Sequence, residues 1–489
     1  MNETYWKTTA SKYPTLTDDI RCSCLVVGGG LCGVLTAYLL GKRGVDTVLI
    51  EKEHLGFGKT MGTTAKATVC HNMIYTRLEK SIGMEGARLY AEANLHGLRL
   101  LRELLLDDGA ASRGDCQRSD FFLYSIYGER RIAAELRCMR ECGILCSPIN
   151  GRESRFELPL RIKSGILVKD QLQFPPLKAI HDIASRSNVG IYEETEAVSA
   201  IRSHAGYIVK TKNGQAIQAS KVIVATNYPV LVPRNLSFIK LYRETSYAAA
   251  LTGAPVLRSM YFGIDGGYAY RSHGSALIVS GERHRTSPVP NAADRLLEEA
   301  KAMFGEVTPL CSWSNNDCYT HDGIPYIGKT GDGLYIASGF NGWGMTNSAS
   351  AALILSYLAV GENLPFAGIF SPSRNIIKSG GESLAHHISI SAAGMAKNLT
   401  VPELTAADIR PGCAGIVSHN GKRTGAYRDN EGKLHLVSLK CPHLGCSIAW
   451  NPAAKTWDCP CHGSRFTPDG ICISEPSTQN SCVEKTSAE

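Results

Sequence analysis

The 489-residue sequence lacks a continuous apolar segment long enough to cross a membrane. A spanning helix needs about 20 apolar residues. The longest candidate, residues 349–360, is shorter than this and contains Ser350, Ser356 and Tyr357. Residues 1–19 are polar and lack the apolar core of a secretory signal peptide. We therefore expect a cytoplasmic protein without a membrane span.

The sequence also lacks long runs of Lys or Arg, internal repeats and low-complexity tracts. Its formal net charge of +7 is small for this length, so nucleic-acid binding is not predicted, although docking of an acidic electron carrier is compatible with it. Cysteine, by contrast, is abundant: there are 17, without the spacing of a disulfide framework. This pattern indicates a reducing compartment. The length allows roughly two or three domains.

A glycine-rich turn lies within a strand–helix–strand pattern over residues 22–50. Gly28 allows a tight turn, Gly30 allows close approach of a pyrophosphate, and Gly33 allows the helix to pack on the sheet. Glu51 ends the second strand and is placed to bind ribose hydroxyls. This βαβ unit predicts a dinucleotide site; the alternative is a glycine turn that binds nothing.

Three later segments have the composition of cofactor-binding elements. Residues 56–66 are rich in Gly and Thr and suit a loop that lies flat against a ring or phosphate, although an ordinary surface loop has the same composition. Residues 221–227 form an apolar strand of the kind that returns to a nucleotide-binding sheet. Residues 339–346 place glycines at the start of a helix, where backbone N–H groups face an anion.

The rest of the chain predicts helices and a second sheet. Apolar residues spaced three and four apart, or a starting proline or cap, predict helices over residues 84–108, 128–141, 175–186 and 291–304. Asn291 is expected to cap the last of these. Residues 239–280 alternate apolar and polar, which predicts an antiparallel sheet that covers a substrate. Residues 362–399 lack periodicity and are predicted to be a tether or strap between domains.

The strongest signal is a pair of Cys/His motifs near the end of the sequence. The first contains Cys441 and His443, and the second contains Cys459 and His462. Thiolates suit an iron that stays ferric, whereas neutral imidazoles lower the net charge of a cluster and ease its reduction. The motifs therefore predict a [2Fe–2S] cluster. Zinc also binds paired Cys and His, but it requires neither the Pro-Cys-His-Gly-Ser run nor the additional cysteine in each motif.

These two motifs resemble the Rieske domain, and specifically its cytochrome-bc-type form. The resemblance implies four iron ligands and one disulfide: Cys441, His443, Cys459 and His462, with Cys446 bonded to Cys461. It also implies that the Ser464 hydroxyl donates a hydrogen bond to a bridging sulfide. Phe466 stands where a tyrosine hydroxyl often donates a hydrogen bond to a ligand sulfur. The absence of this hydrogen bond is expected to lower the reduction potential of the cluster. Residues 474–477 read Ser-Glu-Pro-Ser, so the usual Gly-Pro cover over the cluster is altered.

The first 390 residues resemble the FAD-dependent oxidoreductases of the D-amino-acid oxidase and glycine oxidase family. The βαβ unit and the segments at residues 63–66, 225–227 and 339–346 carry this resemblance. Within the family, the chain is similar to a bacterial group with a C-terminal Rieske domain. The implied fold is α/β, with a Rossmann-like FAD-binding domain and an antiparallel substrate sheet, plus a small all-β Rieske domain. The implied order is a lead (1–20), the oxidoreductase (21–375), a linker (376–398) and the Rieske domain (399–489).

The same resemblance implies the contacts to FAD. The ADP half is expected on Gly28, Gly30, Gly33 and Glu51, and adenine on the backbone of Val198. The flavin ring is expected along Thr63, Thr64, Ala65 and Lys66, and against Gly339, Gly342, Trp343, Gly344, Met345 and Thr346. The N–H groups from Gly342 onward would face the pyrimidine carbonyl, where negative charge accumulates on reduction. Some relatives bind the flavin covalently through a cysteine, and Cys318 lies near that place.

The implied reaction is oxidation of a small amine or amino acid by hydride transfer to FAD. Electrons would then leave one at a time through the Rieske cluster to an external acceptor such as a ferredoxin or quinone. If the substrate has a carboxylate, Arg271 is the candidate to bind it, with Arg283 second. Lys66 and His321 lie beside flavin segments and are the candidate acid–base residues, although a structural role suits each equally well.

Other functions compete with this one. A Rieske oxygenase needs an iron bound by two His and a carboxylate, but His386 and His387 are adjacent while His273 and His284 are too far apart. An electron-transfer protein reduced by NAD(P)H is the second alternative, against which a single G-x-G-x-x-G motif counts. An amine oxidase that uses O₂ is the third.

Overall fold

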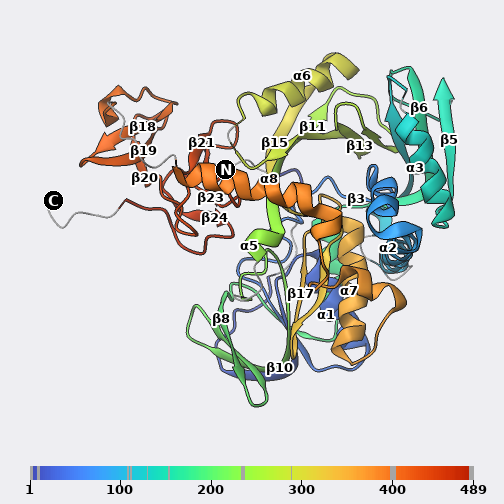
Figure 1. Cartoon of the computed structure of the whole chain (residues 1–489), viewed down its shortest axis with the longest axis horizontal. Coiled ribbons are helices and arrows are strands. Elements are labelled where there is room, and N and C mark those ends of the chain that lie inside the picture. Colours follow the sequence, from blue (N-terminus) through green and yellow to red (C-terminus); the bar gives the residue numbers. More distant parts are fainter. Residues whose placement is uncertain are drawn as a thin grey trace.

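The computed structural model describes residues 4–7, 12–106, 110, 113–128, 130–151, 155–232, 237–287, 289–396 and 404–483. Within these ranges the chain forms two large sheets, here called sheet A and sheet B, and two small sheets near the end of the sequence. Figure 1 shows sheet A below sheet B, with the small sheets beside them and helix α8 (Ile377–Ala396) running across the molecule. None of the helices among the described residues has the length and apolar character needed to cross a membrane.

Sheet A contains the predicted βαβ unit. Its strand order is β16-β17-β10-β1-β2-β7, extended beside β10 by β9 and then β8. Their bounds are β1 (Ile20–Val27), β2 (Thr47–Ile50), β7 (Gly190–Tyr192), β8 (Ala197–Ser203), β9 (Gly206–Thr211), β10 (Ala216–Asn227), β16 (Tyr326–Gly331) and β17 (Leu334–Ser338). Strand β1 pairs in parallel with β2 and β10. The predicted return of residues 221–227 to the nucleotide-binding sheet is therefore confirmed.

Sheet B is mixed rather than wholly antiparallel. Its order is β15-β11-β14-β13-β12-β4-β6-β3, with β5 beside β6. Their bounds are β3 (Lys66–Ala67), β4 (Gln117–Ser125), β5 (Cys146–Gly151), β6 (Ile162–Gln173), β11 (Leu241–Thr252), β12 (Met260–Gly263), β13 (Ala269–His273), β14 (Ala276–Arg285) and β15 (Thr308–Thr320). The hairpins predicted over residues 239–280 are antiparallel, but β12 pairs in parallel with β4. Those two strands come from distant segments, so local alternation does not specify their direction.

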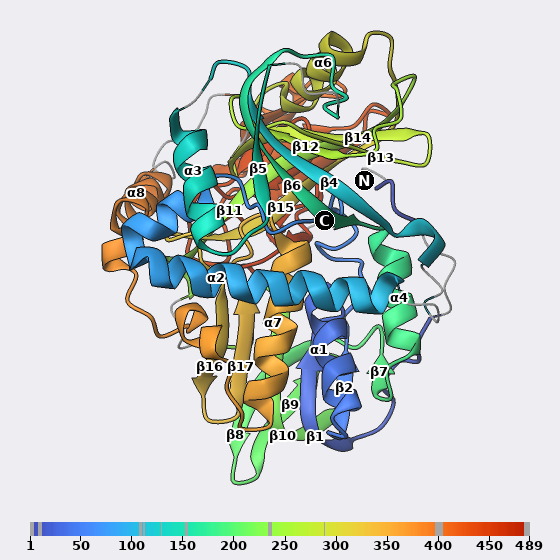
Figure 2. The same ribbon diagram turned by 90° about the vertical axis from the view of Figure 1, so that its right-hand side faces the viewer.

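Helices cover sheet A and separate it from sheet B. The long helix α2 lies between the two sheets, and α1 and α7 lie on sheet A (Figure 2). The helix bounds are α1 (Leu31–Lys42), α2 (Ile74–Leu106), α3 (Arg130–Glu141), α4 (Pro176–Ser185), α5 (Ser237–Lys240), α6 (Ala292–Phe304) and α7 (Gly344–Ala359). Helix α2 begins earlier than predicted because it continues across Gly83, a kink with φ 77°. The predicted end at residue 108 lies outside the described residues. Asn291 precedes α6 at φ 56°, without the predicted side-chain cap.

The small sheets form the all-β region that the sequence predicts. One has the order β18-β19-β20 and the other β21-β22-β23-β24. Their bounds are β18 (Ala414–His419), β19 (Lys422–Arg428), β20 (Leu434–Ser438), β21 (Ala449–Asn451), β22 (Thr456–Asp458), β23 (Arg465–Phe466) and β24 (Cys472–Ser474). The two Cys/His motifs lie in the loops β20–β21 and β22–β23. The second motif lies in a β-hairpin, because β22 pairs with β23, whereas the first joins the two small sheets and contains an isolated bridge between Lys440 and Ser447.

The segment predicted to be an irregular tether is largely helical. Helix α8 follows the short 3₁₀ helix η2 (Pro365–Phe370). It packs closely on the segment that follows β15, because a Cβ added to Gly380 would lie 2.8 Å from the carbonyl carbon of His321. Tertiary packing, rather than an apolar repeat, stabilises this helix. The prediction of an irregular tether, which rested on the lack of an apolar repeat, is therefore wrong for this part of the segment. The predicted boundary at residue 399 lies outside the described residues.

Candidate functional site

The glycine turn forms a cradle at the start of helix α1. Gly28 has φ +110°, and a Cβ added to Gly33 would lie 1.9 Å from the carbonyl oxygen of Gly28. Gly30 is more open, since its added Cβ first meets the Thr60 hydroxyl at 3.4 Å. The same hydroxyl accepts a hydrogen bond from the N–H of Leu31 at 3.1 Å. The turn is therefore closed toward the sheet and open toward a ligand at the helix N-terminus, which suits a pyrophosphate.

Glu51 closes the other side of this cradle. Its carboxylate accepts hydrogen bonds from the N–H groups of Gly29 at 2.6 Å and Glu53 at 3.0 Å. Burial raises the pKa of Glu51, and these N–H groups oppose that rise. Val198 lies farther out on β8, at an irregularity between Ala197 and Ser199, with its side chain 53% exposed. The predicted adenine contact at Val198 stays a prediction.

The loop at residues 63–66 is fixed by side chains from distant segments. Trp6 donates its indole N–H to the carbonyl oxygen of Thr63 at 2.6 Å. Arg271, on β13, donates to the carbonyl oxygens of Ala65 at 2.5 Å and Thr64 at 3.2 Å. Trp6 is buried although it lies in the predicted N-terminal lead. The one feature of the sequence that could have indicated the burial of Trp6 is its large aromatic side chain within a polar segment.

Arg271 contacts other parts of the protein, and its predicted role as the partner of a substrate carboxylate stays a prediction. Besides the loop carbonyls, its Nε donates to the carbonyl oxygen of Ser272 at 3.3 Å, and the guanidinium lies 5.5 Å from the Trp6 ring. Because the side chain is buried and engaged on backbone oxygens, Arg271 holds the flavin loop. The second candidate, Arg283, forms an ion pair with Glu244 at 3.1 Å.

Lys66 and His321, the predicted acid–base candidates, lie in different environments. Lys66 donates from Nζ to the Thr64 hydroxyl at 2.6 Å, and burial, aided by Arg271, lowers its pKa to about 7. The ring nitrogens of His321 are both engaged, with the Ser383 hydroxyl at 2.9 Å and the Ile239 carbonyl oxygen at 2.9 Å. His321 therefore anchors α8, and the acid–base roles predicted for Lys66 and His321 stay predictions.

The segment at residues 339–346 wraps the N-terminus of α7. Gly339 and Gly342 have φ of +72° and +77°. The Asn341 side chain donates to Gly339 O at 2.8 Å and accepts from the N–H of Thr320 at 2.8 Å. Thr346 donates to Thr68 O at 2.7 Å. Trp343, Gly344 and Met345 complete the turn into the helix, whose first N–H groups supply the partial positive charge expected opposite a flavin carbonyl.

Cys318 lies on β15, fully buried in the apolar cluster that includes Val27, Val224 and Leu241. Burial raises the pKa of its thiol, and Arg243 opposes that rise. Attachment of a flavin requires the thiolate, so this setting does not favour it. Covalent attachment through Cys318 stays a prediction.

The four predicted iron ligands converge in the cluster-binding loops. The rings of His443 and His462 lie 4.9 Å apart at 84°. Cys441 and Cys459 are buried and hydrogen-bond one another through sulfur. Burial lowers the pKa of both histidines to about 4, so both are neutral imidazoles at neutral pH. Two thiols and two neutral imidazoles form the donor set that a Rieske [2Fe–2S] cluster requires.

The additional cysteines lie beside these ligands. The sulfur atoms of Cys446, Cys459 and Cys461 are all within 4.8 Å of one another. The structure thus brings the sulfur atoms of Cys446 and Cys461 together, and the disulfide that the resemblance implies between them stays a prediction.

Ser464 is positioned to tune the cluster. Its hydroxyl oxygen accepts a hydrogen bond from the N–H of Ser477 at 2.9 Å and hydrogen-bonds the sulfur of Cys441. We expect Ser464→Ala to lower the reduction potential by up to roughly 100 mV, because hydrogen bonds to sulfur favour the reduced cluster. Redox titration followed by EPR measures this shift. Ser418→Ala, on β18 of the same region, is the control; equal potentials for the two variants would contradict the assignment.

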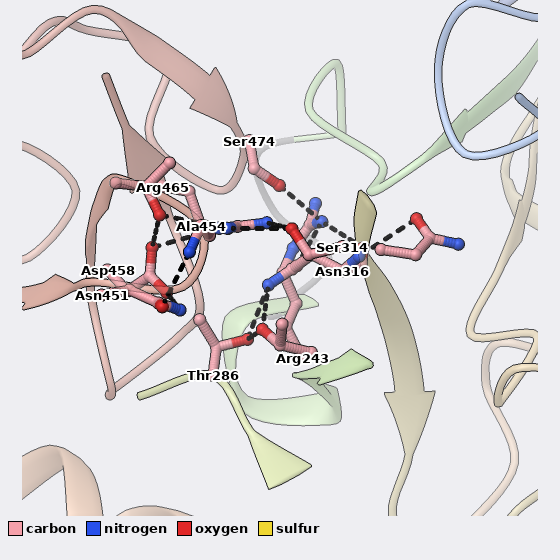
Figure 3. A network of polar contacts seen from close by, with 12 residues as sticks. Arg243, Thr286, Ser314, Asn316, Asn451, Ala454, Asp458, Arg465 and Ser474 are labelled. Carbon is pink, nitrogen blue, oxygen red and sulfur yellow. Dashed lines mark hydrogen bonds and ion pairs between the residues drawn. The ribbon is translucent and has the colours of Figure 1, made fainter. Parts of the chain in front are cut away.

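The second cluster-binding loop sits directly on sheet B. A Cβ added to Gly463 would lie 2.4 Å from the Cβ of Arg243, a residue of β11 with a fully buried side chain. Arg243 donates to the Ser474 hydroxyl at 2.9 Å and the Asn316 side-chain oxygen at 3.0 Å (Figure 3). It also forms an ion pair with Glu475 at 3.1 Å. Burial raises the pKa of Glu475, but Arg243 and neighbouring lysines outweigh burial and hold it below its usual value.

A second set of buried contacts extends this interface. Asn451 donates to the Tyr247 hydroxyl of β11 at 3.2 Å and to Asp458 at 2.8 Å. Arg465 donates to Asp458 at 3.1 Å and to the Ser314 hydroxyl of β15 at 3.3 Å (Figure 3). These residues were not predicted, since their partners lie far away in sequence. Their joint effect is a polar network between sheet B and the cluster-binding region.

Comparisons with known proteins agree with this geometry. A family profile described as FAD dependent oxidoreductase matches residues 23–358, and one described as Rieske [2Fe-2S] domain matches residues 400–486. The chain therefore belongs to the FAD-dependent oxidoreductase family and carries a C-terminal Rieske domain. It is 34% identical over 499 residues to the Rieske 2Fe-2S iron-sulfur protein YhfW of Bacillus subtilis (strain 168), with 97% of this chain and 96% of that protein covered.

More distant relatives share the oxidoreductase part. Gamma-glutamylputrescine oxidoreductase of Escherichia coli (strain K12) is 24% identical over 386 residues, covering 73% of this chain and 89% of that protein. The structure of L-proline dehydrogenase from P. horikoshii has a TM-score of 0.62 at 16% identity, covering 73% of this chain and 98% of that one. Glycine oxidase from Geobacillus kaustophilus has a TM-score of 0.61 at 19% identity, covering 73% and 99%. The two structures establish the shared fold.

The cofactors of this chain are thus FAD and a [2Fe–2S] cluster. The glycine cradle, with its open face at Gly30, fits the pyrophosphate of FAD, and the buried Cys/His set fits the cluster. FAD accepts two electrons with a hydride and releases them singly, whereas the cluster carries one.

The cradle makes a direct prediction for FAD retention. Gly33→Ala is expected to push α1 away from β1, because its new Cβ would lie 1.9 Å from the carbonyl oxygen of Gly28. Overpacking of this kind costs about 1–3 kcal/mol, and we expect the purified variant to lose its yellow flavin absorbance. Gly114→Ala is the matched control, since no atom lies within 4 Å of its added Cβ and Gly114 lies outside the predicted flavin contacts. Normal flavin content in Gly33→Ala would contradict the proposed cradle.

Proposed function

We propose that this protein oxidises a small amine or amino acid by hydride transfer to FAD and passes the electrons singly through its Rieske cluster to an external one-electron acceptor, such as a ferredoxin or quinone. The observation that carries the proposal is the seating of the Cys459–Ser464 loop on sheet B. Gly463 packs against Arg243, so the cluster ligand His462 adjoins the oxidoreductase part. A cluster that served an unrelated partner would not need this buried contact.

The chemistry of the relatives supports the substrate class. Gamma-glutamylputrescine oxidoreductase, glycine oxidase and L-proline dehydrogenase are named for amine or amino-acid substrates. In the proposed reaction the substrate loses a hydride to FAD and a proton from nitrogen, and the resulting imine is hydrolysed by water. Two molecules of one-electron acceptor are each reduced once, which balances the two electrons.

In the proposed reaction Lys66 accepts the substrate proton. An amine must be neutral at nitrogen before its hydride leaves, and a base with a pKa near the working pH serves this purpose. Burial lowers the pKa of Lys66 to about 7, so its neutral form predominates above that pH. Arg271 holds the adjoining backbone of Thr64 and Ala65 and thereby fixes the Lys66 position.

Anaerobic bleaching of the flavin tests the proposed activity. The holoprotein is mixed with a panel of amines and amino acids, or with NADH, and the flavin absorbance is followed. We expect bleaching by a member of the amine panel. Bleaching by NADH alone would overturn the amine proposal in favour of an electron-transfer protein reduced by another donor. Reoxidation by O₂ faster than by one-electron acceptors would instead identify an oxidase.

A further inference from the structure

Helix α8 contributes a side chain that touches both the cluster-binding loop and sheet B. The His387 ring lies 5.4 Å from the ring of the cluster ligand His462, at 75°. It lies 5.5 Å from the ring of His321 on the sheet side. Because His387 is buried, it fills the space between these two histidines. The segment that joins the two parts of the chain is therefore also a structural element of their interface.

Arg285 fixes the orientation of His387. Its guanidinium donates to Nδ1 of His387 at 3.0 Å and stacks on the Tyr242 ring at 4.0 Å. A guanidinium has no acceptor atom and stays charged, so Nδ1 must be the unprotonated nitrogen of this ring. His387 is thus a neutral imidazole with its proton on Nε2.

Aromatic rings continue from His387 toward the flavin segment. Tyr242 lies 6.4 Å from His387 and 5.7 Å from Tyr319, measured between ring centroids. Tyr319 then meets Gly342, since a Cβ added to Gly342 would lie 2.6 Å from the Tyr319 hydroxyl. A continuous series of packed rings therefore joins the cluster ligand His462 to the loop that the FAD-dependent oxidoreductases place against the flavin.

The two ligand histidines have different access to solvent. His462 is 7% exposed and is covered by His387. His443 is partly exposed, and its neighbour Leu444 is 48% exposed. One histidine therefore faces the interior of the protein and the other faces its surface.

We propose that electrons enter the cluster through His462, with His387 as the positioning residue that connects it to sheet B, and leave through His443. This inference rests on the proposed transfer from flavin to cluster. In each turn, one electron leaves the reduced flavin and reduces the cluster by one electron. That electron then passes to a one-electron acceptor that reaches the His443 edge. His387 packs between sheet B and His462, and it is neither oxidised nor reduced in the net reaction.

Labelling with diethyl pyrocarbonate, read by mass spectrometry, tests this arrangement without relying on activity. In the oxidised holoprotein we expect His443 to be labelled and His462 to be protected. His387→Ala is expected to raise labelling of His462 toward that of His443, whereas His387→Phe, which retains a ring, is expected to keep the protection. His386→Ala is the matched control, because His386 is exposed on the same helix. Labelling of His462 as fast as His443 in the unmodified protein would overturn the inference.

Electron transfer is measured on the same three variants after anaerobic reduction of the flavin. We expect slower cluster reduction in His387→Ala, recovery in His387→Phe and no change in His386→Ala. Unchanged rate and labelling in His387→Ala would overturn the inference. If the unmodified protein showed no transfer from flavin to cluster, the proposed function would fail, while the labelling pattern would still decide which histidine faces inward.

Discussion

Replacing Arg243 by methionine is expected to separate the two redox centres. The substitution removes the charge that pairs with Glu475 and leaves the Ser474 hydroxyl and the Asn316 amide oxygen without this donor. Breaking a buried ion pair on one side costs roughly 3–5 kcal/mol. This free-energy cost weakens the contact between the Cys459–Ser464 loop and sheet B. The fraction of molecules in which that contact is formed, and with it the rate of cluster reduction, is then expected to fall by roughly 10²–10⁴-fold. Stopped-flow absorbance after anaerobic flavin reduction measures this rate.

Two variants make this result specific. Arg118→Met removes an arginine that pairs with Asp170 at the surface, where its side chain is 60% exposed, and exposed pairs contribute about 0–1 kcal/mol. We expect its rate to match the unmodified protein. Adding Glu475→Gln to Arg243→Met removes the carboxylate charge that has lost Arg243 and keeps only Lys52 as an ion-pair partner among the described residues, so it is expected to recover part of the rate. A normal rate in Arg243→Met would show that the polar network is not needed for electron transfer.

Replacing Lys66 by methionine is expected to slow flavin reduction by substrate roughly 10²–10⁴-fold, the usual contribution of a general base. In the unmodified protein the rate should rise with pH through about 7 and then level off, because burial lowers the Lys66 pKa to that value and the neutral amine is the active form. The methionine variant should lose this pH step. Anaerobic stopped-flow measurements on both sides of pH 7 give both quantities.

The control for Lys66→Met is Lys169→Met, which changes an exposed lysine on β6 of the same sheet. It is expected to keep both the rate and the pH step. Flavin content and absorbance of Lys66→Met should match the unmodified protein, which separates loss of a base from loss of the cofactor. A pH step near 7 that persists in Lys66→Met would assign the titration to another group.

Features encoded by short-range spacing could be predicted from the sequence. The βαβ unit follows from glycine positions and strand length, and the structure has helix α1 (Leu31–Lys42) between β1 and β2. The cluster-binding loops follow from their Cys/His spacing, and the structure brings His443 and His462 to 4.9 Å. In both cases the residues that specify the structure are close together in the sequence, so their spacing is enough to predict the local geometry.

Features that depend on distant partners could not be predicted. Arg243 contacts Ser474 across 231 positions, and no local pattern indicates which side chain a strand arginine will meet. The hydrogen bonds of Arg271 to the carbonyl oxygens of Thr64 and Ala65 join segments more than 200 positions apart, so no local pattern indicates them. Helix α8 was missed because packing on His321, rather than an apolar repeat, stabilises it.

The most direct test of the account follows the cluster while the flavin is reduced. The holoprotein is mixed anaerobically with the amine or amino acid that bleaches its flavin, frozen at successive times and examined by EPR. The account predicts that the signal of the reduced Rieske cluster grows as electrons leave the reduced flavin, without an added mediator. A fully reduced flavin beside a cluster that stays oxidised would contradict it.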